Sequence, residues 1–259
     1  YAKCRVEKEL WMSERHIFRV SGPDARSFMQ GLVTNDVDRI DAGLVYAALL
    51  TPQGKYLADY FLAADGDDIL LDADRAQADA LRQRLSMYKL RADVALSDSG
   101  LHMHRGLGDV PSDGFADPRH AALGWRAYRE VAQTDDDVDW TALRVAHMIP
   151  KTGVELTPDT FILEVGFEAL NGVDFRKGCY VGQEVTARMK HKTTLRKGLA
   201  QVDVSGDAAP GTEIKAEGKP AGTLLSRAGD AAIAYLRFDR AKGPMQAGDA
   251  EVTWRNASD

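Results

Sequence analysis

The segment KGCYVGQE, residues 177–184, carries the residue types in this chain best suited to chemistry. Its cysteine, Cys179, is one of only two in the chain and is separated by a single glycine from two cations, Arg176 and Lys177. A thiol next to positive charge ionises more easily, and the thiolate is the reactive form. The segment therefore predicts a reactive thiol at Cys179, provided that the side chain is exposed.

The residues after the cysteine predict a helix that would favour the thiolate further. Val181, Val185 and Met189 recur every four residues, so a helix from about Tyr180 would carry a narrow apolar stripe. Cys179 would then lie at the helix N-terminus, where free N–H groups lower a thiol pKa from about 8.5 toward neutrality. The alternative is a small buried residue in a tight turn. Spacing alone favours that alternative, because single cysteines are usually inert.

The charge around the cysteine contrasts with that of the whole chain. Residues 176–197 contain seven Lys and Arg against the single acid Glu184, a net charge of +6, whereas the chain carries −6, so the remainder carries −12. A basic segment on an acidic protein can concentrate anions, although a solvated basic face is the commoner explanation of one charge run. An anionic ligand is therefore one of two open interpretations.

Composition and the remaining motifs exclude several classes of protein. The acidic balance argues against a general nucleic-acid binder, and no apolar run approaches the roughly 20 residues needed to cross a bilayer. No basic stretch followed by an apolar one opens the chain, although its start at Tyr1 leaves a removed leader open. His102 and His104 could share a metal, but no further ligand lies nearby, so we predict no metal site.

The two cysteines, Cys4 and Cys179, are too few for a disulfide framework. They indicate a cytoplasmic protein with free thiols, and they could supply at most two ligands of an iron–sulfur cluster.

Apolar periodicity predicts an α+β body followed by a small β domain. We expect strands at 16–20, 45–50, 56–63, 68–73 and 92–97, and helices after 21–23, over 75–88 and over 135–148. After residue 196, short alternating runs are broken by Gly, Pro and Asp, which is typical of a barrel or sandwich. We therefore place a domain of residues 1–195, with lobes of about 1–100 and 101–195, before a β-barrel of residues 196–259.

The KGCYVGQE segment closely resembles the signature of the YgfZ-type folate-binding proteins, which are relatives of the glycine-cleavage T-protein, an aminomethyltransferase. Matching segments run in the family's order through nearly the whole chain, so coincidence is a poor explanation. They are FMQGLVTNDV (28–37), LTPQGKYLADYFL (50–62), LSMYKLRADVAL (85–96), LRVAHMIP (143–150) and NGVDFRKGCYVGQEVTARMKHKTTLRKGL (171–199).

The resemblance implies two pseudo-symmetric α+β lobes around a central folate-binding hole, followed by a C-terminal β-barrel. It implies tetrahydrofolate as the cofactor, and the basic segment would suit the anionic glutamate tail. It also implies a role in the assembly or repair of iron–sulfur clusters, with iron–sulfur enzymes or cluster-assembly proteins as partners of a monomer. No nucleic acid or membrane is implied.

The resemblance also nominates site residues. Cys179 would be the important thiol, with Lys177 holding its anion and Asp59 as the group able to transfer protons. The folate-binding residues would come from the matching segments and from the signature: Asn35, Asp36, Lys55, Tyr88, Arg91, Tyr180, Gln183 and Arg188. Structural alternatives are a helix C-cap for Asn35 and Asp36, a solvated turn for Lys55, and core or surface pairing for Tyr88 and Arg91.

Two departures from the T-proteins bear on the reaction. The T-proteins have adjacent aspartates where this chain has Ala58-Asp59, and a glutamate where this chain has Ala146. Aminomethyl transfer needs a carboxylate near the pterin, so the loss of these partners lowers the prospect of an enzyme. The first hypothesis is a folate-dependent iron–sulfur accessory factor. The alternatives are a tetrahydrofolate-dependent aminomethyltransferase that uses Asp59, and an interaction module that binds no folate.

Overall fold

The computed structural model describes residues 15–134, 137–192 and 194–255. The chain divides into two compact units, each built from two stretches of sequence. The first unit comprises Tyr1–Asp137 and Glu168–Gln183, and the second comprises Val138–Phe167 and Glu184–Asp259. Cys4 lies outside the described residues, and the predicted lobe boundaries remain predictions.

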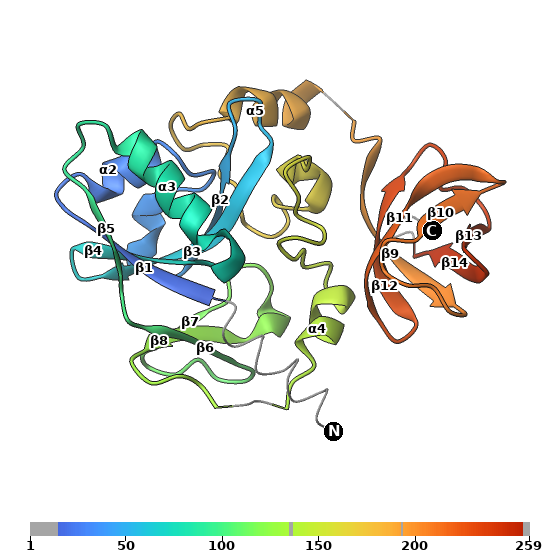
Figure 1. Cartoon of the computed structure of the whole chain (residues 1–259), viewed down its shortest axis with the longest axis horizontal. Coiled ribbons are helices and arrows are strands. Elements are labelled where there is room, and N and C mark those ends of the chain that lie inside the picture. Colours follow the sequence, from blue (N-terminus) through green and yellow to red (C-terminus); the bar gives the residue numbers. More distant parts are fainter. Residues whose placement is uncertain (1–14, 135–136, 193, 256–259) are drawn as a thin grey trace. The chain divides into compact units, whose positions relative to one another are not determined.

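The first unit is centred on a five-stranded antiparallel sheet in the order β2-β3-β4-β1-β5. Its strands are β1 (Arg15–Ser21), β2 (Val45–Leu50), β3 (Tyr56–Asp65), β4 (Asp68–Asp74) and β5 (Ala95–Asp98). The helices α2 (Ala25–Gln30) and α3 (Ala78–Lys89) pack on one face of it (Figure 1). The short 3₁₀ helices are η1 (Val37–Asp41) and η2 (Arg75–Gln77). The predicted strands and helices of residues 16–97 are confirmed here.

Alternation along the strands gives this sheet two different faces. Tyr60 and Leu62 of β3 join the apolar core beneath α2 and α3. Asp59 and Phe61 alternate with them and therefore lie on the other face, where Phe61 pairs in register with Asp72 of β4. Both faces are buried, so one of them carries polar groups that need partners within the protein.

A smaller sheet belongs to the same unit. It has three antiparallel strands in the order β6-β8-β7, namely β6 (His102–Gly106), β7 (Gly114–Ala116) and β8 (Trp125–Arg129), with η3 (Ala121–Leu123) between the last two. Among the described residues no cluster of three or more metal-ligating side chains occurs, at His102 and His104 or elsewhere.

The second unit contains a closed six-stranded antiparallel barrel in the order β10-β11-β12-β9-β14-β13. Its strands are β9 (Lys197–Ser205), β10 (Glu213–Ala216), β11 (Lys219–Ala228), β12 (Ala231–Arg237), β13 (Met245–Ala247) and β14 (Ala250–Trp254). Inward-facing residues such as Val202, Leu224 and Leu236 form its core. The predicted C-terminal barrel is confirmed.

The remaining helices are α4 (Trp140–Ala146), η4 (Ile162–Val165) and α5 (Gln183–Lys192). Asp139 begins α4 by accepting a hydrogen bond from the N–H of Ala142, so this helix is shorter than the predicted 135–148. No helix in the described part of the chain has the length and apolar character needed to span a membrane.

Candidate functional site

The thiol of Cys179 lies on an exposed loop whose neighbouring side chains are buried. Cys179 and Gly178 are exposed, whereas Lys177 on one side and Tyr180 on the other are buried. The alternative interpretation of a small buried cysteine is therefore wrong. The side chains on either side fix the loop, and the thiol is left at the surface.

Lys177 attaches this loop to the chain before η1. Its Nζ donates hydrogen bonds to the carbonyl oxygens of Gln30 at 2.9 Å, Val33 at 2.6 Å and Asn35 at 2.8 Å. Burial lowers the pKa of Lys177 to about 8, although Asp36, Asp174 and Asp38 act in the opposite direction. The ammonium group was expected to hold a thiolate, but its three donors are bonded to backbone carbonyls. It therefore acts as a positional anchor.

The residues that precede Lys177 are bonded to the same part of the chain. The amide nitrogen of Asn35 donates to the carbonyl oxygens of Tyr46 and Asn171, and the hydroxyl of Thr34 donates to the carbonyl of Gly172. The N–H of Asp174 donates to the carbonyl of Thr34 at 3.0 Å. Two segments more than 130 residues apart in sequence are thus joined by backbone and buried side-chain hydrogen bonds.

The far side of the loop is fixed by Gly182, whose φ of +85° lies in the left-handed region. A Cβ at this position would lie 2.6 Å from the carbonyl oxygen of Thr51 and 2.9 Å from the Cβ of Leu50, so glycine is required. A left-handed residue cannot belong to an α-helix. α5 therefore begins at Gln183 and not near Tyr180, and the prediction that Cys179 lies at its N-terminus is wrong.

The other residues nominated within the signature have local roles. The side-chain amide of Gln183 donates to the carbonyl of Gly178 at 3.3 Å, and Tyr180 lies with its ring centroid 5.3 Å from Nζ of Lys177. Arg188 is exposed and pairs with Glu184 at 2.8 Å across one helical turn. An exposed pair of this kind contributes little to stability.

Asn35 and Asp36 do not cap α2, which ends five residues earlier. Asp36 begins η1 instead, because its Oδ1 accepts from the N–H of Asp38 and also from the side-chain amide of Gln30. Both nominated residues are therefore bonded within the loop that receives Lys177, and the structural alternative of a helix C-cap is wrong.

The other nominated residues of the first unit lie at the ends of two elements. Lys55 is half-buried at the β2–β3 turn. Tyr88 is half-buried against the core beneath α3, and Arg91 is exposed just beyond that helix. Lys55 and Arg91 therefore retain some access to solvent.

Asp59 is buried on the polar face of the five-stranded sheet. The hydroxyl of Tyr46 donates to its Oδ2 at 3.0 Å and the hydroxyl of Tyr56 donates to its Oδ1 at 2.6 Å. Each carboxylate oxygen is therefore already an acceptor for a tyrosine, so a structural role accounts for this residue without a bound pterin.

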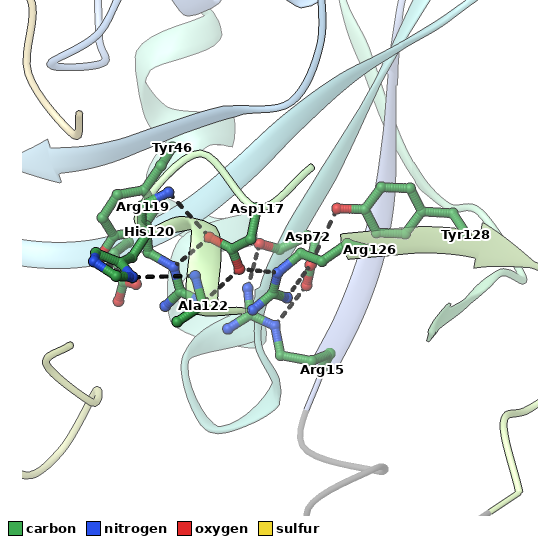
Figure 2. A network of polar contacts seen from close by, with 10 residues as sticks. Arg15, Tyr46, Asp72, Asp117, Arg119, His120, Ala122, Arg126 and Tyr128 are labelled. Carbon is green, nitrogen blue, oxygen red and sulfur yellow. Dashed lines mark hydrogen bonds and ion pairs between the residues drawn. The ribbon is translucent and has the colours of Figure 1, made fainter. Parts of the chain in front are cut away.

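Beside Asp59, a buried ionic network joins the two sheets of the first unit (Figure 2). Asp72 of β4 accepts from Arg15 at 2.5 Å, from Arg126 at 3.1 Å and from the hydroxyl of Tyr128 at 3.2 Å. Arg126 also donates to Asp117 at 3.0 Å. Arg126 thus links an acid on the large sheet to an acid beside the small one.

Arg119 completes the buried ionic network. It donates to both carboxylate oxygens of Asp117, at 3.0 and 2.8 Å, and its guanidinium carbon lies 4.8 Å from the ring centroid of Phe61. Burial by itself lowers the pKa of Arg119, but Asp117, with smaller help from Asp59, outweighs this and holds the pKa above its ordinary value. The network therefore contains three guanidinium groups, and Asp59 supplies the third carboxylate that balances them.

Sequence reasoning missed this network. One signal was present, since Asp72 interrupts the apolar run of β4 at a position that faces the interior. Its partners are 54 or more residues away in sequence. Arg15 lies at the start of β1, and Arg126 lies on β8 of the small sheet. Their approach could not be read from spacing.

Comparison with known proteins places these features in context. Residues 196–258 match the family model described as CAF17, C-terminal beta-barrel domain. The iron–sulfur cluster assembly factor IBA57 of Mus musculus is 32% identical over 278 residues, with 89% of this chain and 78% of the relative covered. The IBA57 homologue of Mycosarcoma maydis is 32% identical over 216 residues, and the chain spans 54% of its length.

A solved structure shows the same fold. Glycine cleavage system aminomethyltransferase T from Bartonella henselae superposes with a TM-score of 0.75, covering 94% of this chain and 83% of the other at 15% identity. The predicted T-protein fold with an added barrel is thereby confirmed, whereas the narrower YgfZ-type resemblance stays a prediction. The predicted cytoplasmic location is wrong, because the relatives are named as mitochondrial proteins and point to the mitochondrion.

Proposed function

The chain belongs to the IBA57 family of iron–sulfur cluster assembly factors, and we propose that it acts in cluster assembly or repair through the thiol of Cys179. The observation that supports this proposal is the combination of an exposed sulfur with a fixed backbone. Cys179 is exposed, while Lys177 forms three hydrogen bonds to carbonyls on one side and Gly182 packs against the β2–β3 turn on the other.

An exposed thiol on a fixed backbone can contact an iron–sulfur cluster that another protein carries. Cluster iron is held by cysteine thiolates, commonly four for each cluster. The chain contains two cysteines, so at least two of four ligands have to come from a partner protein. The cluster is then cargo or substrate, and Cys179 supplies one sulfur at a defined position.

Tetrahydrofolate remains the proposed ligand, and the nominated residues fit one part of it. Arg188 of α5 is an exposed cation and would suit a carboxylate of the glutamate tail. Asp59, the carboxylate expected near the pterin, already accepts two tyrosine hydroxyls. Charge pairing with the tail is therefore the contact that we propose, and we assign no reaction step to the folate.

The decisive test is genetic complementation with a matched control. In cells that lack their own relative, the full chain should restore the activity of an iron–sulfur enzyme, and Cys179→Ser should restore less than about a tenth of it. Gly178→Ala is the control, because a Cβ there meets no atom within 4 Å, and it should restore full activity.

Abundance and Tm of both variants should match those of the wild type, because the side chain of Cys179 is exposed and a Cβ added at Gly178 meets no atom within 4 Å. Full restoration by Cys179→Ser would overturn the proposal.

A further inference from the structure

A large apolar residue follows helix α3 at a position where the backbone disfavours a side chain and where the side chain is not buried. Leu90 follows α3 with φ of 45° and ψ of −102°, and its side chain is 89% exposed. A positive φ is strained for any residue with a Cβ, and Gly would hold it with less strain. An exposed leucine gains nothing from the hydrophobic effect within this chain.

Leu90 has neighbours that would suit a contact outside the chain. Met87, three residues earlier, is 57% exposed. Lys89 and Arg91 on either side of Leu90 are exposed cations. We name the surface formed by Met87, Lys89, Leu90 and Arg91 the α3 tip.

The charge on this part of the chain is of one sign. Residues 82–91 contain four cations and no acid, on a chain whose net charge is −6. The face of α3 that supports the tip is well anchored, because Leu81 and Leu85 are buried in the core. The tip is thus a small apolar anchor within a basic rim on a supported helix.

We propose that the α3 tip is a docking surface for a protein partner that offers an apolar pocket rimmed by carboxylates. Protein interfaces typically have an apolar core surrounded by a polar rim, and complementary charges across the interface steer association and fix its register. Two apolar side chains are too few for stable attachment to a lipid surface, so a protein is the better occupant. The partner is recognised by charge complementarity to Lys89 and Arg91 and by a cavity that accepts Leu90.

Site-specific photocrosslinking in cells tests the contact directly. The full chain is produced with a benzophenone amino acid at position 90 or, as control, at position 131. Val131 is also apolar and is 77% exposed in the same unit, but it follows Glu130. We expect a discrete adduct from position 90 and none from position 131. Lys89→Glu with Arg91→Glu should reduce the yield at least ~10-fold.

Complementation with stability measured in parallel separates docking from folding. Leu90→Gly should raise Tm by about 2–4 °C, since it relieves the positive φ, and yet lower the restored iron–sulfur enzyme activity several-fold. Val131→Gly should leave that activity unchanged. A variant that is both more stable and less active cannot be explained by misfolding.

Three results would overturn the proposal. The first is full activity of Leu90→Asp. The second is an adduct at position 90 that survives reversal of both charges. The third is flotation of the chain with vesicles of 70% phosphatidylcholine and 30% phosphatidylserine that is lost in Leu90→Asp, which would identify a membrane as the occupant. Because the crosslink does not involve Cys179, failure of Cys179→Ser to abolish activity would overturn the proposed function and leave this docking test standing.

Discussion

At the scale of single residues, the exposed thiol depends on two neighbours that are buried. Lys177 donates hydrogen bonds to three backbone carbonyl oxygens and so satisfies them. Gly182 has no side chain, so its backbone can lie against the β2–β3 turn at a distance that any Cβ would prevent. A buried cation is stable here because each of its protons has an acceptor. The lysine and the second glycine of KGCYVGQE are thus explained by packing, while the cysteine is the member left for chemistry.

Lys177→Met should destabilise the protein by about 2–4 kcal/mol, because methionine keeps the apolar stem and removes all three donors. Urea unfolding followed by circular dichroism measures the change. The loop should also loosen, so we expect faster hydrogen exchange at residues 176–182. Lys55→Met, at a half-buried position in the β2–β3 turn, is the control and should cost less. Equal stability of Lys177→Met and wild type would contradict the anchor.

Asp59→Ala should lower the free energy of unfolding by about 2–4 kcal/mol, because two buried tyrosine hydroxyls lose their acceptor. Asp41→Ala, which breaks an exposed pair with Arg26, should change it much less.

In a methylene-transfer assay with tetrahydrofolate we expect no activity that depends on Asp59. Activity that vanishes in Asp59→Ala and persists in Cys179→Ser would instead establish the aminomethyltransferase alternative.

At the scale of elements, the buried ionic network joins β1 and β4 of the large sheet to β8 and the residues after β7 in the small one. Removing one partner from such a network leaves a buried charge without its counterion, which typically costs about 3–5 kcal/mol. The network therefore fixes how the two sheets pack. Phe61 contributes through its ring, which lies 4.0 Å from the guanidinium carbon of Arg126.

The network predicts how stability depends on pH. Burial alone would raise the pKa of Asp117, but Arg119 and Arg126 outweigh it and hold the pKa far below the unfolded value of about 3.9. A depressed folded pKa gives stability that is present above about pH 4 and is lost as the pH falls toward the folded pKa. Asp117→Asn should therefore show a flatter decline in the free energy of unfolding below about pH 4.

The matched control is Asp113→Asn. Asp113 also pairs with an arginine, Arg129 at 2.7 Å, and its pKa is lowered too, but the pair is exposed. Its smaller effect should disappear in about 0.5 M NaCl, because salt screens exposed pairs, whereas the effect of Asp117 should persist. Equal salt sensitivity of the two variants would show that the network is not shielded from solvent.

At the scale of the whole molecule, charge is divided unevenly along the chain. The segment 176–197 holds a net charge of +6 on a protein of −6, and several of its cations are exposed. Exposed cations in one short stretch raise the local concentration of anions. This is the property that a polycarboxylate ligand such as tetrahydrofolate would exploit.

Calorimetry with tetrahydrofolate should give a Kd in the micromolar range, which corresponds to about −8 kcal/mol. Lys190→Glu and Lys192→Glu should each weaken binding several-fold, and binding should weaken further with added salt. Lys219→Glu, a reversal at an exposed barrel residue outside the basic segment, is the control and should leave Kd unchanged. The absence of heat across a wide concentration range would favour the module that binds no folate.

The sequence alone determined the elements and their class. Alternation and helical spacing predicted β2 at 45–50 and the barrel after residue 196, because local periodicity reflects which side chains face a core. These inferences succeeded because each depends on residues that are close together in the chain. KGCYVGQE also identified Cys179 as the candidate thiol, but spacing alone favoured a buried cysteine, and its exposure is seen only in the structure.

Only the tertiary structure decided what the nominated polar residues do. The acceptors of Lys177 lie more than 140 residues away, Tyr46 reaches Asp59 from the neighbouring strand β2, and Arg126 reaches Asp72 from another sheet. Gly182 has a left-handed backbone and lies close to the carbonyl of Thr51. Because of this conformation, α5 begins after Gly182 and not at Cys179. Partners of buried polar groups are fixed by packing between distant segments, and no local pattern encodes that packing.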